Sequence, residues 1–233
     1  MSDDRADDAA RADYAGVHEP RYQRIAAGEQ PGWSSSEEVA GMLSQIDWAL
    51  ALPDAPSAGR LLELGSGDGC LTERLAARPD WRVSGIDIVP LAIELAQTRL
   101  DAAGVRAELA AGEVTALPLP DHTFDLLVDS HCLHCIVNAD RVACLAEARR
   151  VLRPGGMLIV ITMCGDPAYL MGGEFDPATR NLVREGIAGR HFGTVESILG
   201  ELAAAGFAVK QHRIWPARHE MENDDLVVAA VRV

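Results

Sequence analysis

From residue 60 onward, short apolar runs alternate with segments in which apolar residues recur every three or four positions. The apolar runs predict strands at 60–64, 82–87, 106–110, 124–129 and 157–163. The periodic segments predict helices at 70–78, 91–103, 139–152 and 195–205. Alternating strands and helices are typical of a parallel sheet covered by helices, so the pattern predicts an α/β fold.

Two later regions depart from this alternation. Residues 207–215 and 226–233 are both apolar and strand-like, and the short link between them allows a hairpin, which predicts one antiparallel strand. Residues 164–193 are rich in glycine and contain two Asp-Pro pairs. Such a stretch is long for a connection in a compact domain, so we expect a lid-like or substrate-binding insert there.

The N-terminal region has its own pattern. Apolar residues at helical spacing follow the serines and acids of 34–38, which is a typical helix start, and Pro53 and Pro56 end this helix. We therefore expect residues 13–56 to form cap helices. The acidic and polar residues 1–12 predict a disordered tail.

Composition and charge narrow the possible functions. The chain has 233 residues, 48% of them hydrophobic, which suits one α/β domain with a sizeable core. Its formal net charge is −14, and Lys210 is its single lysine. Binding to nucleic acids and anionic membranes depends on Lys and Arg, so both kinds of partner are disfavoured.

The sequence also bears on location and redox state. No apolar stretch reaches the roughly 18 residues of a membrane span. The first residues resemble neither a secretory nor a transit peptide, so we expect a cytoplasmic protein. The five cysteines are an odd number, which favours free thiols over a disulfide framework.

A glycine-rich turn is the first candidate for chemistry. Gly65, Gly67 and Gly69 follow the strand 60–64 with a spacing that differs from the nicotinamide fingerprint. Asp87 ends the next strand, 22 residues after Gly65, where nucleotide sites place a carboxylate on ribose hydroxyls. An ordinary strand-to-helix turn and a helix cap at Asp87 are the alternatives.

Further motifs follow in a fixed order: Gly112-Glu113-Val114, Leu117-Pro118-Leu119, Phe124 to Asp129, and Arg149-Arg150-Val151-Leu152-Arg153-Pro154-Gly155-Gly156. With the glycine turn and Asp87, this succession resembles the class I S-adenosylmethionine (SAM)-dependent methyltransferases, in particular the branch that acts on small molecules. The resemblance implies a SAM-binding domain at 57–233. It also implies a Rossmann-like sheet of seven strands with only the last antiparallel, helices on both faces, and an N-terminal helical cap.

The resemblance further implies how the chain would bind the methionine portion of SAM. The backbone of Gly65, Ser66, Gly67 and Gly69 would line this portion, and Glu63 would support its amino group. These positions would converge because open α/β sheets bind ligands outside the carboxyl ends of their strands.

By the same resemblance, Asp87 would accept hydrogen bonds from the two ribose hydroxyls, and Ile88 would lie against adenine. Glu113 would accept a hydrogen bond from the adenine amino group, and Val114 would donate its backbone N–H to the ring. The family more often has Asp at the position of Glu113, and a solvated loop residue is the other interpretation of this glutamate.

The end of the strand 124–129 is the candidate catalytic region. The resemblance implies that Asp129 and Ser130 face the sulfonium, and it aligns His134 with an apolar-His position common in the family. His131 is the better candidate for a general base, because an imidazole titrates near neutral pH. We name both histidines as catalytic candidates, and a buried structural histidine is the alternative for His131.

Residues 131–135 read His-Cys-Leu-His-Cys, which raises the question of zinc. The two residue types alternate, so they cannot all converge on one ion from so short a stretch. A second ligand pair is absent, and Cys164 is the one plausible distant ligand. We therefore expect no metal.

Candidate substrate contacts lie outside these motifs. Tyr22 and Trp33 are similar to the cap that many of these enzymes fold over SAM. Arg180, Arg184 and Arg190 lie in the predicted insert and could each bind a substrate carboxylate. A solvated helix face is the alternative for each arginine.

These features favour methyl transfer from SAM to a small molecule whose accepting atom (O, N, S or C) the sequence does not specify. An aminopropyltransferase that uses decarboxylated SAM is one alternative. Gly-Asp-Gly at 67–69 weakly favours this alternative, and the absence of an N-terminal hairpin domain disfavours it. A non-catalytic SAM-binding module is the other. The sequence leaves a homodimer open.

Overall fold

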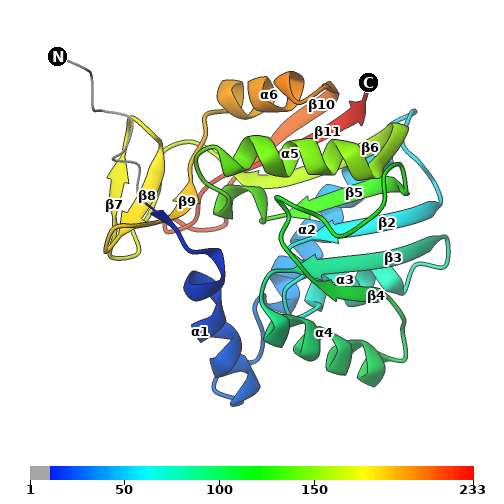
Figure 1. The fold of residues 1–233 in the computed structure, drawn as a ribbon, viewed down its shortest axis with the longest axis horizontal. Helices are drawn as coiled ribbons and strands as arrows, with labels where there is room; N and C mark the ends of the chain where they lie inside the picture. The colour runs from blue at the N-terminus through cyan, green and yellow to red at the C-terminus, as the bar shows by residue number, and fades with distance from the viewer. Residues whose placement is uncertain (1–10) are drawn as a thin grey trace.

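The computed structural model describes residues 11–233, and its centre is a sheet of seven strands. The strands lie in the order β10-β11-β6-β5-β2-β3-β4 (Figure 1). Their bounds are β2 Gly59–Leu64, β3 Trp81–Asp87, β4 Glu108–Ala111, β5 Phe124–Ser130, β6 Leu152–Met163, β10 Phe207–Trp215 and β11 Asp225–Arg232. β11 is antiparallel to both of its neighbours and the other pairs are parallel, which confirms the predicted sheet.

The start of β6 differs from the sequence prediction. Leu152 already pairs with Phe124, and the register then shifts before Met157 pairs with Leu126. The segment 153–156, which lies between the predicted helix 139–152 and the predicted strand 157–163, is therefore an irregular beginning of the strand. The Pro-Gly-Gly sequence suits this irregularity, because glycine tolerates the positive φ of +77° found at Gly155.

Helices cover both faces of the sheet (Figure 1). α2 (Ser36–Leu50) and α3 (Cys70–Ala76) pack on one face, and α5 (Asp140–Val151) and α6 (Val195–Ala204) pack on the other. Neighbouring residues along a strand point to opposite faces, so strands buried on both sides are apolar throughout. α4 (Pro90–Ala103) follows β3 and lies beside α3 and α1 (Tyr14–Ala26). Among the described residues, no helix is long and apolar enough to cross a membrane.

The insert forms a second, smaller sheet. Its strands are β7 (Glu174–Asp176), β8 (Asn181–Arg184) and β9 (Ile187–His191), which pair antiparallel. Figure 1 shows this sheet outside the edge toward which the parallel strands of the central sheet point. A short 3₁₀ helix, η1 (Leu133–Cys135), follows β5 at the same edge.

The N-terminal region joins this smaller sheet. The predicted disordered tail, 1–12, lies outside the described residues apart from Arg11 and Ala12, which form β1 and pair with β9. The prediction is wrong at these two residues, because the free edge of β9 offers their backbone hydrogen-bond partners. α1 (Tyr14–Ala26) follows, capped by the Asp13 carboxylate on the backbone N–H of Gly16. α1 and α2 both lie within the region expected to form cap helices.

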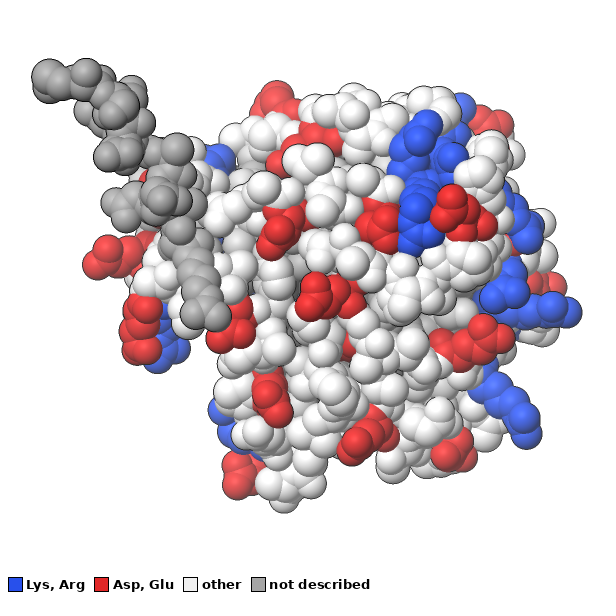
Figure 2. Space-filling view, in the orientation of Figure 1, with Lys and Arg blue, Asp and Glu red and all other residues white. Residues whose placement is uncertain are grey.

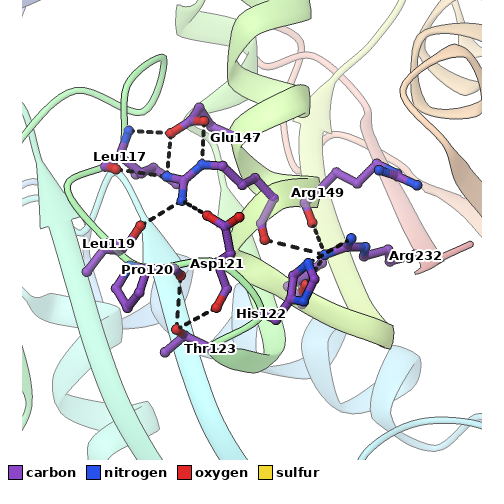
Figure 3. A network of polar contacts seen from close by, with 11 residues as sticks. Leu117, Leu119, Pro120, Asp121, His122, Thr123, Glu147, Arg149 and Arg232 are labelled. Atoms are coloured by element: carbon purple, nitrogen blue, oxygen red, sulfur yellow. Dashed lines mark hydrogen bonds and ion pairs between the residues drawn. The ribbon is translucent and has the colours of Figure 1, made fainter.

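Arg150 ties the loop before β5 to α5 (Figure 3). Its guanidinium donates to the Glu147 and Asp121 carboxylates and to the carbonyls of Leu117 and Leu119. Glu147 in turn accepts the backbone N–H of Leu117 at 2.7 Å. This network fixes the loop that carries the predicted adenine contacts.

We predict that Arg150→Ala lowers the free energy of unfolding by about 1–3 kcal/mol, because the loop carbonyls and Glu147 lose a charged donor. Urea denaturation measures this change. The matched control is Arg74→Ala on α3, where an exposed arginine should change stability by less than about 0.5 kcal/mol. Equal effects of the two substitutions would contradict the role of Arg150.

Candidate active site

A cavity of about 580 Å³ lies at the carboxyl ends of β2, β3 and β5. α1, α2, η1 and β9 also contribute to its walls. The register of the sheet brings the strand ends together, because Leu64 pairs with both Ile86 and Asp129. Open α/β sheets bind ligands at this edge, so the cavity is the candidate active site.

The glycine turn between β2 and α3 lines one part of the cavity. Gly67 has a φ of +56°, which other residues rarely adopt, and its N–H points to the Asp87 carboxylate at 3.0 Å. Gly65 and Ser66 also line the cavity, and the buried Ser66 hydroxyl has no hydrogen-bond partner. Gly69 is the exception: a Cβ there would lie 2.8 Å from Ala96 Cβ. Gly69 thus allows close packing of α3 on α4 and does not line the cavity, and its predicted cofactor contact stays a prediction.

Asp87 lies at the end of β3 with both carboxylate oxygens engaged. One oxygen accepts the N–H of Val89, the residue before α4, and the other accepts the Gly67 N–H. The Tyr22 hydroxyl lies 3.4 Å from this second oxygen, at the long limit of a hydrogen bond. Burial raises the pKa of Asp87 although both N–H groups lower it. The carboxylate therefore holds the segment that leads into α4 and also faces the cavity.

Glu63 is a buried acid in the same wall of the cavity. Its carboxyl accepts the Thr72 hydroxyl at 2.5 Å. Burial, together with the negative charges of Asp87 and Asp68, raises the pKa of Glu63 to about 8. Asp68, also buried, has one carboxylate oxygen on the Trp33 N–H and Arg99, and its other oxygen has no partner.

The predicted adenine contacts line the cavity beside Asp87. Ile88 and Val114 contribute apolar surface, and Glu113 is exposed at the rim. The Glu113 carboxylate receives only a long contact of 3.5 Å from the Thr115 hydroxyl, so it is open to other donors.

The two residues at the end of β5 point in different directions. Ser130 lines the cavity and donates its hydroxyl to the Met42 sulfur at 2.8 Å. Asp129 is buried away from the cavity, and its carboxylate accepts the backbone N–H groups of Cys132 and Leu133. Successive strand residues face opposite sides, so Asp129 holds the start of η1 and does not line the cavity; its predicted place beside the sulfonium stays a prediction. Burial raises the pKa of Asp129 to about 7.

His131 follows with a φ of +65° and lines the cavity. Its Nε2 lies 3.7 Å from a carboxylate oxygen of Asp225, which also accepts the Gln45 side-chain N–H at 3.0 Å. Its Nδ1 is buried and has no partner. Burial lowers the pKa of His131, and Asp225 opposes this change. The imidazole is therefore neutral at neutral pH and can accept a proton.

His134 and Cys135 lie one turn later, in η1. The Arg190 guanidinium, from β9, lies 2.7 Å from His134 Nε2 and 3.4 Å from the Cys135 sulfur. The buried side chain of Arg141 holds this turn by donating to the carbonyls of Leu133 and Ile136. His134, Cys135 and Arg190 all line the cavity.

The predicted substrate contacts divide into two groups. Tyr22 and Trp33 line the cavity and stack on each other with ring centroids 4.8 Å apart, beside the glycine turn. Arg180 and Arg184 do not line it. Arg180 is held by the carbonyls of Phe192 and Gly165, and Arg184 is exposed. The structure therefore does not bring these two arginines to the cavity, and their predicted role as substrate contacts stays a prediction.

Sequence reasoning missed several cavity residues, of which His18 and Asp225 bear most on the chemistry. His18 lies on α1 and donates Nδ1–H to the Tyr14 carbonyl, which leaves Nε2 for the cavity. Its spacing of four residues from Tyr22 is a helical signal that could have identified it. Asp225 begins β11, and no local pattern distinguishes it from other surface acids. Among residues 11–233, no group of three or more His, Cys, Asp or Glu is arranged to hold a metal ion.

Comparison with known proteins places residues 61–156 in a family described as a methyltransferase domain. A ubiquinone/menaquinone biosynthesis C-methyltransferase of Paracoccus denitrificans is 30% identical over 181 residues, which cover 75% of this chain and 70% of that protein. A malonyl-acyl-carrier-protein O-methyltransferase of Geobacter sulfurreducens is 32% identical, covering 68% of this chain and 59% of that protein.

A solved structure agrees in fold. The 1,6-didemethyltoxoflavin-N1-methyltransferase of Burkholderia thailandensis, determined with S-adenosylhomocysteine, superposes with a TM-score of 0.68 at 20% identity. The match covers 93% of this chain and 87% of that one.

The raised pKa of Glu63 predicts a pH-dependent stability. The folded chain keeps a proton on Glu63 up to about pH 8, whereas the unfolded chain loses it near its ordinary pKa of about 4.3. The free energy of unfolding should therefore fall between these pH values, by up to about 1.4 kcal/mol per pH unit. Glu63→Gln keeps an oxygen for Thr72 and should reduce this slope. The slope that remains is smaller and comes from Asp129, whose pKa is also raised by burial.

Urea denaturation at about pH 5 and about pH 7.5 measures the slope. Glu94→Gln, on the exposed side of α4, is the matched control and should follow the wild type at both pH values. An undiminished slope in Glu63→Gln would show that Glu63 ionises normally in the folded chain.

Proposed function

Since the chain belongs to the class I SAM-dependent methyltransferases, for which SAM is the cofactor, we propose that its cavity places the methyl group of SAM beside a small-molecule acceptor at His131. The proposal depends on one observation: a single cavity contains both groups of residues. The glycine turn and Asp87 form one end of it, and His131, with Asp225 beside it, forms another part of its wall.

The residues of the cavity fit SAM. A volume of about 580 Å³ is within the usual range of ligand sites. The Ser66 hydroxyl and one oxygen of Asp68 are buried without partners and are therefore ready to bind polar groups. Glu63 is a buried acid with no cationic partner, as its raised pKa reflects, and an ammonium group would satisfy it.

When bound, SAM supplies an electrophilic methyl group on a sulfonium. Asp87 would accept the ribose hydroxyls on the oxygen that now faces Gly67 and Tyr22. Ile88 and Val114 would enclose adenine, with Glu113 at its amino group. Glu63, Gly65 and Ser66 would hold the methionine portion, and Ser130 would line its far end. Positioning in a site shielded from water is the main contribution such residues make.

His131 would act as the general base for acceptors that lose a proton. Its lowered pKa keeps it neutral, and Asp225 orients the ring and stabilises the charge that it gains. Gln45 holds Asp225 in place. The relatives and the similar structure are named as C-, O- and N-methyltransferases, so they leave the accepting atom of this chain open. Their names favour methyl transfer over aminopropyl transfer or binding without catalysis.

We propose that the partner is a small molecule and not a nucleic acid or membrane. On the face shown in Figure 2, acidic side chains are spread widely and basic ones gather toward one side. Arg150 and Arg153 are paired with Asp121 and Asp125, so they are poor phosphate ligands. The five free cysteines suit the expected cytoplasmic location. A homodimer stays an open expectation.

Asp87→Ala should weaken binding of S-adenosylhomocysteine by about tenfold to a hundredfold, because two charge-assisted hydrogen bonds are lost. Calorimetric titration measures the affinity. Thermal unfolding checks that the chain stays folded when Gly67 and Val89 lose the acceptor of their backbone N–H groups. The matched control is Asp101→Ala on α4, an exposed acid outside the cavity. Unchanged affinity in a folded Asp87→Ala would rule out the ribose assignment.

His131→Ala should lower turnover by about 10²–10⁴-fold and leave the affinity for SAM nearly intact, because a base acts on the acceptor. Asp225→Asn should lower turnover less and shift the acid limb of the pH–rate profile. An acceptor from a screen of small-metabolite pools with labelled SAM supplies the assay. Full activity of His131→Ala at every pH would assign catalysis to proximity alone.

A further inference from the structure

Cys135 is a nucleophile in the cavity that methyl transfer to a small molecule does not use. Its sulfur lies 3.4 Å from Arg190 Nη1 and 3.6 Å from the His131 carbonyl oxygen, and the side chains of His18 and His134 are close enough to lower its pKa. Arg190, His18 and His134 come from β9, α1 and η1, so three separate elements converge on one sulfur. Cys135 and these three side chains all line the cavity.

The surroundings of Cys135 stabilise a thiolate. Burial alone would raise its pKa, but His134, Arg190 and His18 hold the pKa of Cys135 well below the ordinary value. Among the described residues, the hydrogen-bond partners of Arg190 are only His134 and Cys135, so no carboxylate competes for its charge. The titratable groups that interact with this sulfur are His18, Tyr22, Asp129, His131, Cys132, His134 and Arg190.

Two other cysteines of the same cavity show that the neighbouring side chains, and not burial, lower the pKa of Cys135. Cys70 lines the cavity beside Asp68 and Glu63, and burial with these acids raises its pKa to about 12. Burial and Asp129 likewise raise the pKa of Cys132. Cys135 is therefore set apart from them by Arg190 and the two histidines around it.

The position of η1 brings this thiolate into the cofactor's space. Cys132 packs against the glycine turn, where a Cβ on Gly65 would lie 3.0 Å from its sulfur. Cys135 is one turn further along, with its N–H on the Cys132 carbonyl at 2.8 Å. Gly65, Gly67 and Cys135 line one continuous cavity.

We propose that Cys135 is itself a methyl acceptor, which takes the methyl group of SAM when no small-molecule acceptor fills the cavity. The proposal rests on the proposed binding of SAM in this cavity. A bond forms between the Cys135 sulfur and the methyl carbon, and the bond from that carbon to the sulfonium breaks, leaving its electron pair on the departing sulfur. A thiolate and a sulfonium become two neutral thioethers, so no base and no further reactant is required.

The first test needs no SAM. Iodoacetamide at about pH 6.5, followed by peptide mapping, should alkylate Cys135 at least about tenfold faster than Cys70 and Cys132 in the same sample. S-adenosylhomocysteine should slow alkylation of Cys135. Arg190→Gln should slow it about tenfold, and Arg190→Lys should retain most of the rate. Equal rates at the three cysteines of the wild type would overturn the proposal without any variant.

The second test detects the methyl group. The wild type incubated with labelled SAM should gain one methyl group, mapped to Cys135, and Cys135→Ser should gain none while binding SAM normally by calorimetry. If the wild type binds SAM and iodoacetamide alkylates Cys135, but Cys135 gains no methyl group, this proposal is overturned and the proposed function still stands. Methylation at Cys70 or Cys132 would also overturn it. Failure of the wild type to bind SAM would overturn both.

Discussion

The parallel pairing of β2 with β3 and β5 is the constraint on which the site depends. Leu64 pairs with Ile86 on one side and with Asp129 on the other, so three strands end at one level. A slip of one residue would turn each terminal side chain to the opposite face. The register therefore brings the glycine turn, Asp87 and Ser130 to one cavity, although they are far apart in the sequence. The Arg150 network then fixes the loop that closes its rim.

Charge is divided within the cavity of this acidic protein. Glu63 and Asp87 lie at the end formed by the glycine turn, where burial raises the pKa of both. Arg190, His18 and His134 gather around Cys135 at another part of the wall. Because Glu63, Asp87 and His134 are buried, they act strongly on whatever enters the cavity. A cationic cofactor suits the acidic end, and a thiolate or an anionic group suits the other.

The sequence could predict features that depend on local pattern. The order of strands, turns and helices predicted the sheet. Asp87 lies in the cavity because it ends a parallel strand at the edge where the cavity forms. Asp129 could not be placed this way, since its direction follows from the alternation along β5 and from the N–H groups of η1. The pairing of Asp225 with His131 and the contact of His18 with Cys135 arise only from tertiary packing.

A crystal structure of the protein with S-adenosylhomocysteine tests the central claim most directly. The account predicts the ribose on the Asp87 carboxylate, with the Tyr22 hydroxyl moved or shared, the homocysteine along Gly65 and Ser66, and its sulfur facing the space between His131 and Cys135. A ligand whose ribose lies away from Asp87, or whose sulfur points away from both side chains, would contradict it.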